Sequence, residues 1–589
     1  MYSNIQSVQI MVALLKKYGI TDIVLAPGGS DIPLIHSIEQ DHYFTCYSVV
    51  DERSLVYFAI GVSQQKESKV ACVCTSGTAV CNFLPGITEA YYQNVPIIVI
   101  TADKNPYFQD QLETQKINQD NIFGDKVKKM VNLPIVNTEI DWWLCERKIN
   151  EALLAVDHHG TGPVHINIPI IGPTSIYDCQ KLPDVRKIER VDMYNKSEWK
   201  KCQSILKQKK KIMVIVGQNI KFSKNTLESM NAFFDKYNCI YAVENLSNLD
   251  CQGTIYTYPL SEMLSTACGN RVFDKLSPDL IISLGNNLSA YDLKSRLRKR
   301  YKSCEHWLIS EKGEVRDEYM CLIKIFECNP STFFGEMVSL DNEQIINSRK
   351  YFELWKNYLD QVDLGDIEFS SLYIAKRLSE IIPEKSIIHS AILNSTRVMQ
   401  FFRMKKNVKM YSNVGGLGID GCLSTFMGQA VVTDELAFLL IGDLSFFYDM
   451  NAAGIRERNN NIRIVMLNNG GGEEFHFFMG KKNIPTINDY ISVKHSKCAD
   501  GWIKSLGYEY YAVNSISEFE QLEAVLANKS DKPIFVEVFL DMENDSKYLR
   551  NKYNEFNDKM LPYHISVAKK IASSLPEKRV EQVRKIFKI

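Results

Sequence analysis

The chain has 589 residues, of which 45% are hydrophobic and 24% charged, a composition typical of globular proteins. This length exceeds what one hydrophobic core organises and predicts several domains. The formal charge of −1 gives no overall basic field, so we expect no nucleic-acid partner. No run approaches the roughly 18–20 apolar residues of a membrane span, and the N-terminus lacks a secretory signal pattern. We therefore expect no membrane association.

The 15 cysteines show no metal-ligand spacing. Cys72 and Cys74 alternate inside an apolar run, as small buried side chains do. This cysteine usage predicts reduced thiols and a cytoplasmic location.

Apolar runs that alternate with helical patterns form three sets along the chain. The sets lie at 22–27, 44–50, 69–77, 95–103 and 162–170; at 211–219, 239–246 and 279–287; and at 386–391, 408–416, 436–443, 462–472 and 532–540. Almost continuously apolar runs indicate parallel strands covered on both faces by helices. The predicted fold class is α/β, with three doubly wound parallel-sheet domains at 1–180, 195–345 and 365–545. Residues 546–589 are predicted to form a C-terminal helical extension that packs on a neighbouring domain or subunit.

Two neighbouring runs of the third set end in polar residues suited to a metal-bound diphosphate. The first delivers Gly442 and Asp443 to its carboxyl end, where ligands bind in open α/β sheets. Glycine admits a close approach of the diphosphate, and a helix beginning near Ser445 would offer N–H donors. The second run ends in Asn469 and three glycines, 26 positions after Asp443.

Mg²⁺ prefers octahedral oxygen ligands, usually a carboxylate, neutral oxygens and phosphates. Asp443, the amide oxygen of Asn469 and the backbone carbonyl of Gly471 would supply such a set from two neighbouring strand ends. A strand-end turn that merely contains Asp and Asn is the alternative. The two strands, the paired asparagines and the spacing together favour the metal site.

Several motifs carry a resemblance to a known family. They are GDLSFFYDMNA at 442–452, NNGGG at 468–472, GIDGCLST at 418–425, DERS at 51–54, TSGTAVCN at 75–82 and TAD at 101–103. The chain resembles the thiamine-diphosphate (ThDP) enzyme superfamily and, within it, the SEPHCHC synthase family of menaquinone biosynthesis. The resemblance runs from about residue 8 to 540, with the motifs in the family's order.

The resemblance implies ThDP and Mg²⁺ as cofactors. It makes the first domain the pyrimidine-binding (Pyr) domain and the third the diphosphate-binding (PP) domain, with a central domain between them. The implied cofactor-binding residues are Thr75, Ser76, Gly77, Ile419, Gly442, Asp443, Leu444, Ser445 and Asn469. The implied metal ligands are Asp443, Asn469 and Gly471.

Two residues are implied to act in catalysis. Glu52, at the start of an amphipathic helix, matches the glutamate that faces the aminopyrimidine and activates ThDP. Gln115 matches a glutamine that contacts the cofactor-bound intermediate. From the residues alone, Glu52 could equally complement the helix dipole, Gln115 could be a surface residue and Ile419 a core residue.

The arginines with which the family grips its multiply anionic substrates are largely missing. The corresponding positions hold, in chain order, Ser30, Lys104, Tyr291 with Asp292, Met399 and Val414. Arg397 lies two positions before Met399. Each lost charge-assisted contact costs roughly 1.5–3 kcal/mol, so we expect that the chain is not a true SEPHCHC synthase.

The leading prediction is therefore a ThDP- and Mg²⁺-dependent 2-oxoacid decarboxylase and carboligase that transfers an acyl carbanion to a carbonyl acceptor. Its partners would be a small-molecule 2-oxoacid and an uncharged or sugar-like acceptor. Candidate substrate residues are Ser30, Lys104, Asn394, Ser395, Arg397 and Glu473. The alternatives are a ThDP-dependent hydrolase or lyase that releases no CO₂, and a non-catalytic scaffold with the ThDP fold.

In the superfamily, the glutamate-bearing domain of one subunit meets the diphosphate domain of another. The resemblance thus implies a homodimer or homotetramer with active sites between subunits.

Overall fold

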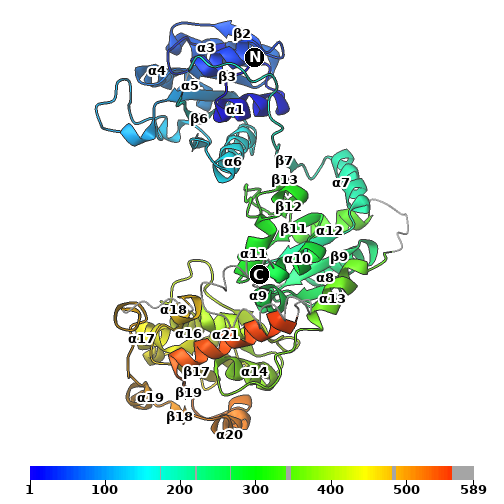
Figure 1. Ribbon diagram of the computed structural model, residues 1–589, viewed down its shortest axis with the longest axis vertical. Helices are drawn as coiled ribbons and strands as arrows, with labels where there is room; N and C mark the ends of the chain where they lie inside the picture. Colours follow the sequence, from blue (N-terminus) through cyan, green and yellow to red (C-terminus); the bar gives the residue numbers. More distant parts are fainter. Residues whose placement is uncertain (173, 219–221, 265–266, 340–346, 480–485, 560–589) are drawn as a thin grey trace, which may run out of the picture. The chain divides into compact units, whose positions relative to one another are not determined.

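The structure, a computed structural model, describes residues 1–172, 174–218, 222–264, 267–339, 347–479 and 486–559 (Figure 1). The chain divides into two compact units, Met1–Val191 with Gly313–Ile325, and Asp192–Lys312 with Phe326–Ile589. The chain contains three parallel β-sheets with flanking helices, which confirms the predicted α/β fold class. Among the described residues, no helix combines the length and apolar character needed to cross a bilayer.

The first unit contains a six-stranded sheet with the order β2-β1-β3-β4-β6-β5, in which every pairing is parallel. Its strands are β1 (Asp22–Leu25), β2 (Thr45–Ser48), β3 (Val70–Cys74), β4 (Ile97–Asp103), β5 (Met130–Asn132) and β6 (Val164–Pro169). Its helices are α1 (Gln6–Lys17), α2 (Ile32–Glu39), α3 (Glu52–Lys66), α4 (Thr78–Asn82), α5 (Leu84–Tyr92) and α6 (Glu139–Ala155).

Helices cover both faces of this sheet. In β3, Ala71 and Val73 belong to the core formed with α1, α2 and α6, whereas Val70, Cys72 and Cys74 belong to the core formed with α3, α4 and α5. Successive side chains of a strand point to opposite faces, so burial on both sides requires an unbroken apolar run. The strand cysteines are therefore core residues, as predicted.

The central part of the second unit carries a sheet with the order β10-β9-β8-β11-β12. The strands are β8 (Ile212–Val216), β9 (Cys239–Val243), β10 (Thr254–Tyr256), β11 (Leu280–Leu284) and β12 (Glu305–Ile309). The helices are α7 (Lys196–Gln208), α8 (Lys224–Lys236), α9 (Tyr258–Met263), α10 (Ala267–Leu276), α11 (Tyr291–Arg298), α12 (Pro330–Ser339) and α13 (Lys350–Leu359). The chain passes between the two units at β7 (Glu189–Val191) and β13 (Leu322–Phe326).

The remaining part of the second unit repeats the strand arrangement of the first sheet, with the parallel order β15-β14-β16-β17-β19-β18. Its strands are β14 (Ile387–Ser390), β15 (Lys409–Tyr411), β16 (Ala437–Gly442), β17 (Ile462–Asn468), β18 (Glu509–Val513) and β19 (Ile534–Phe539). Its helices are α14 (Ser371–Ile381), α15 (Asn394–Met399), α16 (Cys422–Val431), α17 (Asp443–Asp449), α18 (Glu473–Met479), α19 (Asp500–Ser505), α20 (Ile516–Ala527) and α21 (Met542–Lys559).

Helix α21 is the part of the predicted C-terminal extension that the structure describes. It begins at Met542 and contacts α18, to which the Arg550 guanidinium donates a hydrogen bond at the His476 carbonyl, 2.9 Å away. Residues 560–589 of the predicted extension lie outside the described residues.

Candidate active site

The predicted residues of the first unit gather at the carboxyl edge of its sheet. Ser30 follows β1, Thr75 to Gly77 follow β3, and Lys104 follows β4, three strands that are neighbours in the sheet. Glu52 follows β2, which pairs with β1. Parallel strands place their carboxyl ends at one edge, where ligands bind in this class of fold.

Two of these loops pack tightly against each other. The Ser30 amide donates to the Thr75 hydroxyl at 3.2 Å, and the hydroxyls of Ser30 and Ser76 lie 3.1 Å apart. A Cβ added to Gly28 would lie 2.2 Å from the Thr75 Cβ, so this close approach requires glycine. The loops that follow β1 and β3 therefore together form a polar surface at this edge of the sheet.

Gln115, in the segment after β4, contacts this polar surface. Its side-chain amide donates to the Ser76 carbonyl at 3.1 Å, and a Cβ added to Gly77 would meet its side chain at 2.8 Å. Gln115 itself has a positive φ of 60°, a strained conformation for a residue other than glycine. Gln119, which the sequence did not single out, accepts from the Gly77 amide at 3.1 Å and donates to Asn167 at 2.7 Å.

Glu52 is the first residue of α3, as the sequence predicted. The side chain of Asp51 caps this helix by accepting hydrogen bonds from the amides of Arg53 at 3.0 Å and Ser54 at 3.4 Å. Asp51 thus performs the capping, and the half-buried Glu52 carboxylate is left for another task.

Asp31 is a buried acid that the sequence reasoning missed. It is the N-cap residue of α2 but its side chain makes no cap bond, it is 0% exposed, and neither carboxylate oxygen has a hydrogen-bond partner. Burial, and after it the charge of Glu52, raises the pKa of Asp31 from 3.8 to about 6. The charge of Glu52 therefore acts on Asp31.

Lys104 is the cation that the resemblance keeps in the first unit. It directly follows Asp103, which forms an ion pair with Lys116. Its backbone amide donates to Asp103 at 2.7 Å, while the Lys116 ammonium contacts both Asp103 oxygens at 2.8 Å. Both side chains of this ion pair are buried. Lys116 therefore serves Asp103, whereas no ion pair of the half-buried Lys104 is found among the described residues.

In the second unit, β16 and β17 end side by side, with Gly442 opposite Leu467. Asp443 follows at once and is buried. One of its oxygens accepts from the amides of Gly470 at 2.7 Å and Gly471 at 3.1 Å, and the His495 Nε2 lies 3.4 Å from the same oxygen. The predicted pair of strand ends is thus brought together around one carboxylate.

Asn469 is oriented by Glu473. The side-chain nitrogen of Asn469 donates to a Glu473 oxygen at 2.6 Å, and its amide oxygen accepts from the Gly471 amide at 3.3 Å. Only the NH₂ group of the amide can donate to a carboxylate, so this bond fixes which way the amide faces. The Asn469 oxygen and the Asp443 carboxylate consequently converge on the same Gly471 amide.

These donors fit a Mg²⁺ ion. A buried carboxylate and an amide oxygen of fixed orientation meet beside a glycine backbone, which is the hard-oxygen set this ion takes from proteins. Gly471 has φ +156°, and an added Cβ would lie 2.7 Å from the Ser492 carbonyl. The loop that carries the expected backbone ligand therefore admits only glycine at this point.

The other predicted cofactor residues surround the same strand end. The Leu444 amide donates to Asp443 at 2.6 Å, and the Ser445 hydroxyl donates to the Ile419 carbonyl at 2.6 Å. Ile419 is half-buried and packs against the core beneath β16. These contacts fix the GIDG segment to the start of α17, which begins at Asp443 rather than near Ser445.

Glu473 lies between Asn469 and a second acid, Asp545 of α21. Both are buried, and one oxygen of each has no hydrogen-bond partner. Burial, followed by the nearby Asp545, raises the pKa of Glu473 well above 4.5, and burial likewise raises the pKa of Asp545. Two adjacent buried carboxylates would repel each other, so this arrangement favours the protonated form of these acids.

Arg397, Asn394 and Ser395 lie on α15, where Ser395 is buried. The Arg397 guanidinium donates to the two oxygens of Glu474 at 2.6 and 2.7 Å, with side chains only 11% and 13% exposed, and also donates to the Asn394 oxygen. This is a buried, bidentate ion pair. The predicted substrate cation already holds a carboxylate of its own chain.

Comparisons with known proteins show the family to which the chain belongs. Residues 5–122 match the family described as "Thiamine pyrophosphate enzyme, N-terminal TPP binding domain". The chain is 36% identical to 2-succinyl-5-enolpyruvyl-6-hydroxy-3-cyclohexene-1-carboxylate synthase of Phocaeicola vulgatus over 568 residues, 95% of this chain and 100% of the relative. The enzymes of the same name from Bacteroides thetaiotaomicron and Bacteroides fragilis are 35% and 33% identical, again over 95% of this chain and 100% of each relative.

Thiamine pyrophosphate is the same compound as ThDP, so the matched domain and the full-length relatives agree with the resemblance read from the motifs. The chain belongs to the 2-succinyl-5-enolpyruvyl-6-hydroxy-3-cyclohexene-1-carboxylate (SEPHCHC) synthase family of ThDP-dependent enzymes, which form carbon–carbon bonds.

Proposed function

We propose that the chain is a Mg²⁺- and ThDP-dependent enzyme that decarboxylates a small 2-oxoacid and joins the acyl unit to a carbonyl acceptor. We further propose that its substrates differ from those for which its relatives are named. The observation that carries this proposal is the buried ion pair between Arg397 and Glu474.

The chain's own residues would divide the work as follows. Asp443, Asn469 and the Gly471 carbonyl would hold Mg²⁺ and, through it, the diphosphate. Glu52 would hold a proton at N1′ of the aminopyrimidine, and Gln115 would contact the reacting group. Bound ThDP supplies the carbon nucleophile and the electron sink.

A substrate carboxylate could bind Arg397 only by displacing Glu474. That exchange would leave Glu474 buried without its partner, and breaking a buried ion pair costs about 3–5 kcal/mol. The position before it, Glu473, is also acidic and buried. This half of the site therefore favours an uncharged, hydrogen-bonding acceptor over a polycarboxylate.

CO₂ release from a panel of 2-oxoacids, measured with ThDP and Mg²⁺, tests the reaction. We expect turnover with a monocarboxylate such as pyruvate, little with 2-oxoglutarate, and loss of turnover in Glu52→Gln. Efficient reaction of 2-oxoglutarate with isochorismate would refute the altered specificity. Cleavage of a cyclic diketone without CO₂ release would favour the lyase alternative, and unaltered behaviour of Glu52→Gln the scaffold.

The matched variant is Glu474→Gln, which leaves the Arg397 charge unpaired. We expect it to improve the use of 2-oxoglutarate relative to pyruvate. The control is Glu457→Gln, whose side chain is 60% exposed and pairs with Arg456 on the surface. An equal response of both variants would show that Glu474 has no role in selectivity.

We also propose a homodimer or homotetramer in which Glu52 of one subunit serves the metal site of another, as the family resemblance implies. Sedimentation of the purified chain tests the assembly, and a monomer that retains full turnover would contradict it. We place the reaction in the cytoplasm because the described cysteines are free thiols.

A further inference from the structure

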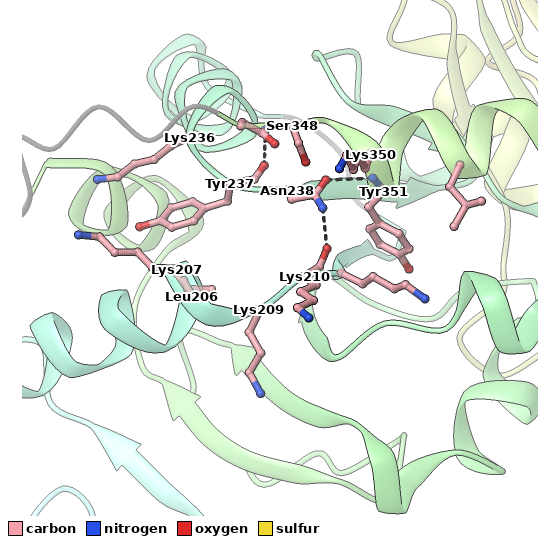
Figure 2. A pocket seen from close by; sticks show the side chains of 13 residues that line it. Leu206, Lys207, Lys209, Lys210, Lys236, Tyr237, Asn238, Ser348, Lys350 and Tyr351 are labelled. Atoms are coloured by element: carbon pink, nitrogen blue, oxygen red, sulfur yellow. Dashed lines mark hydrogen bonds between the residues drawn. The ribbon is translucent and has the colours of Figure 1, made fainter.

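The second unit contains a pocket of about 450 Å³ at the amino ends of β8 and β9. Among the described residues, thirteen line it, of which six are lysines and none is acidic, although the chain's 69 Lys and Arg balance its 70 Asp and Glu. The lysines are Lys207, Lys209, Lys210, Lys211, Lys236 and Lys350, and Figure 2 shows the labelled ones around the pocket. We call this site the lysine pocket.

Local structure accounts for four of these lysines. Lys207 and Lys236 lie in the last turns of α7 and α8, where a cation complements the helix dipole. Lys209 pairs with Glu305 at 2.9 Å, and the Lys211 ammonium donates to the Lys275 carbonyl at 2.6 Å.

Lys210 and Lys350 have no such account. Neither side-chain ammonium has an acidic partner among the described residues, and both side chains are exposed, although the Lys210 backbone amide donates to Asp279 at 2.9 Å. Lys350 is the first residue of α13 and follows the N-cap residue Arg349, whose guanidinium pairs with Asp235 at 2.7 Å. The Lys350 ammonium therefore lies at the positive end of a helix, a position that a bound anion would stabilise.

The backbone around the two lysines is held in place. The side-chain nitrogen of Asn238 donates to the Lys210 carbonyl at 2.6 Å, and its side-chain oxygen accepts from the backbone amide of Tyr351 at 3.0 Å, as Figure 2 shows. These hydrogen bonds connect the residues just before β8 and β9 to the first turn of α13. Lys210 and Lys350 are therefore presented from fixed positions on different elements.

The chemistry of the lining identifies the ligand class. No arginine is among the described residues that line the lysine pocket. Arginine binds carboxylates bidentately, whereas lysine binds phosphate as a point charge. Two unpaired cations on separate elements suit two phosphate groups. Leu206, Tyr237 and Tyr351 are buried beneath them and provide an apolar floor for an attached group.

We propose that the lysine pocket binds a small molecule bearing a diphosphate. The volume lies in the range of ordinary small-molecule sites. The site is distinct from the candidate cofactor site, because none of the predicted cofactor or metal residues lines it. The proposal does not depend on the reaction proposed above.

Calorimetric titration of the full chain, preloaded with one equivalent each of ThDP and Mg²⁺, tests the proposal. Inorganic diphosphate and ADP are titrated at low and high NaCl. We expect one further site per chain, an affinity that falls with salt, and at least tenfold weaker binding to Lys210→Glu/Lys350→Glu. The matched control is Lys224→Glu/Lys406→Glu, which changes the same charge at side chains that are 89% and 71% exposed.

Absence of a further site, or equal binding by both double variants, would overturn the proposal. Lys210→Gln/Lys350→Gln removes the charge without reversing it and serves if the glutamate variant does not fold. Tighter binding of ADP than of inorganic diphosphate would identify a nucleotide ligand, and equal binding would identify the diphosphate group alone as the recognised feature.

Discussion

Glu473 orients the side-chain amide of Asn469, which we propose as a Mg²⁺ ligand. It accepts from the Asn469 side-chain nitrogen at 2.6 Å, and it is buried beside Asp545. Groups that orient metal ligands typically contribute 10- to 100-fold in metal affinity. We had predicted Glu473 as a substrate residue, and its contacts support the orienting role.

The variants Glu473→Gln and Glu473→Leu separate orientation from simple packing. Gln keeps an acceptor for Asn469, whereas Leu has none. We expect Leu to raise the Mg²⁺ concentration needed for ThDP binding about tenfold or more, and Gln to raise it much less. Quenching of tryptophan fluorescence by ThDP at varied Mg²⁺ measures this without turnover. Equal Mg²⁺ dependence in both variants would remove the orienting role.

Asp31 makes stability depend on pH. Its pKa is raised to about 6 in the folded chain, so folded molecules retain a proton that unfolded ones release above about 4. The stability of the first unit therefore falls as pH rises from about 4 to about 6 and stays lower above that range.

We expect Asp31→Asn to stabilise the chain by about 1–3 kcal/mol at pH 7.5 and by less at pH 5. No cap is lost, because the Asp31 side chain makes no cap bond. Thermal unfolding at both pH values measures the difference. Asp184→Asn, at a side chain 96% exposed, is the control. A lower unfolding temperature of Asp31→Asn at pH 7.5 would contradict the assignment.

At the scale of elements, every apolar run found in the sequence contains a strand. The sequence does not predict six of the described strands, for physical reasons. β5, β7 and β10 have only three residues each, and β18 is an edge strand with one buried residue, so it shows no continuous apolar run. β12 and β13 contain His306 and Lys324 within the run, and these polar side chains find partners in Ser283 at 2.7 Å and Glu189 at 3.1 Å.

The candidate site likewise contains residues that the sequence could predict and residues that it could not. Asp443 and Asn469 could be predicted because each directly follows a strand. The pairing of Arg397 with Glu474 could not, because 77 positions separate the two and only the packing of α15 against α18 brings them together. Asp545 could not be predicted because nothing in the sequence of a polar, charged helix distinguishes a buried acid from an exposed one.

Helix α21 anchors this part of the second unit from one side. The Asp545 carboxylate accepts from the Ser371 amide at the start of α14, 3.0 Å away, and the Met542 amide donates to the Asn469 carbonyl at 3.1 Å. Helix α21 therefore supports both α14 and the loop that follows β17.

Asp545→Ala leaves the Ser371 amide without its acceptor, and an unsatisfied buried donor costs about 1–3 kcal/mol. We expect a lower unfolding temperature and weaker Mg²⁺-dependent ThDP binding. The control Glu555→Ala changes an acid of the same helix whose side chain is 62% exposed. An unfolding temperature equal to the parent's would show that α21 does not anchor α14.

At the scale of the whole molecule, the site's components are divided between two units. Glu52, Asp31 and Gln115 belong to the first, and Asp443, Asn469 and Arg397 belong to the second. Within each unit, these residues gather at the carboxyl edge of one sheet. The proposed assembly of subunits would bring a first-unit edge to a second-unit edge.

The exchange of the ThDP C2 proton for deuterium, followed by quenched-flow NMR on the enzyme with Mg²⁺, tests the central proposal without any knowledge of the substrate. If Glu52 activates a cofactor held by Asp443 and Asn469, exchange on the parent enzyme is fast, and Glu52→Gln slows it at least ~100-fold while still binding ThDP. Asp443→Ala loses the binding itself. Unchanged exchange in Glu52→Gln would contradict the account.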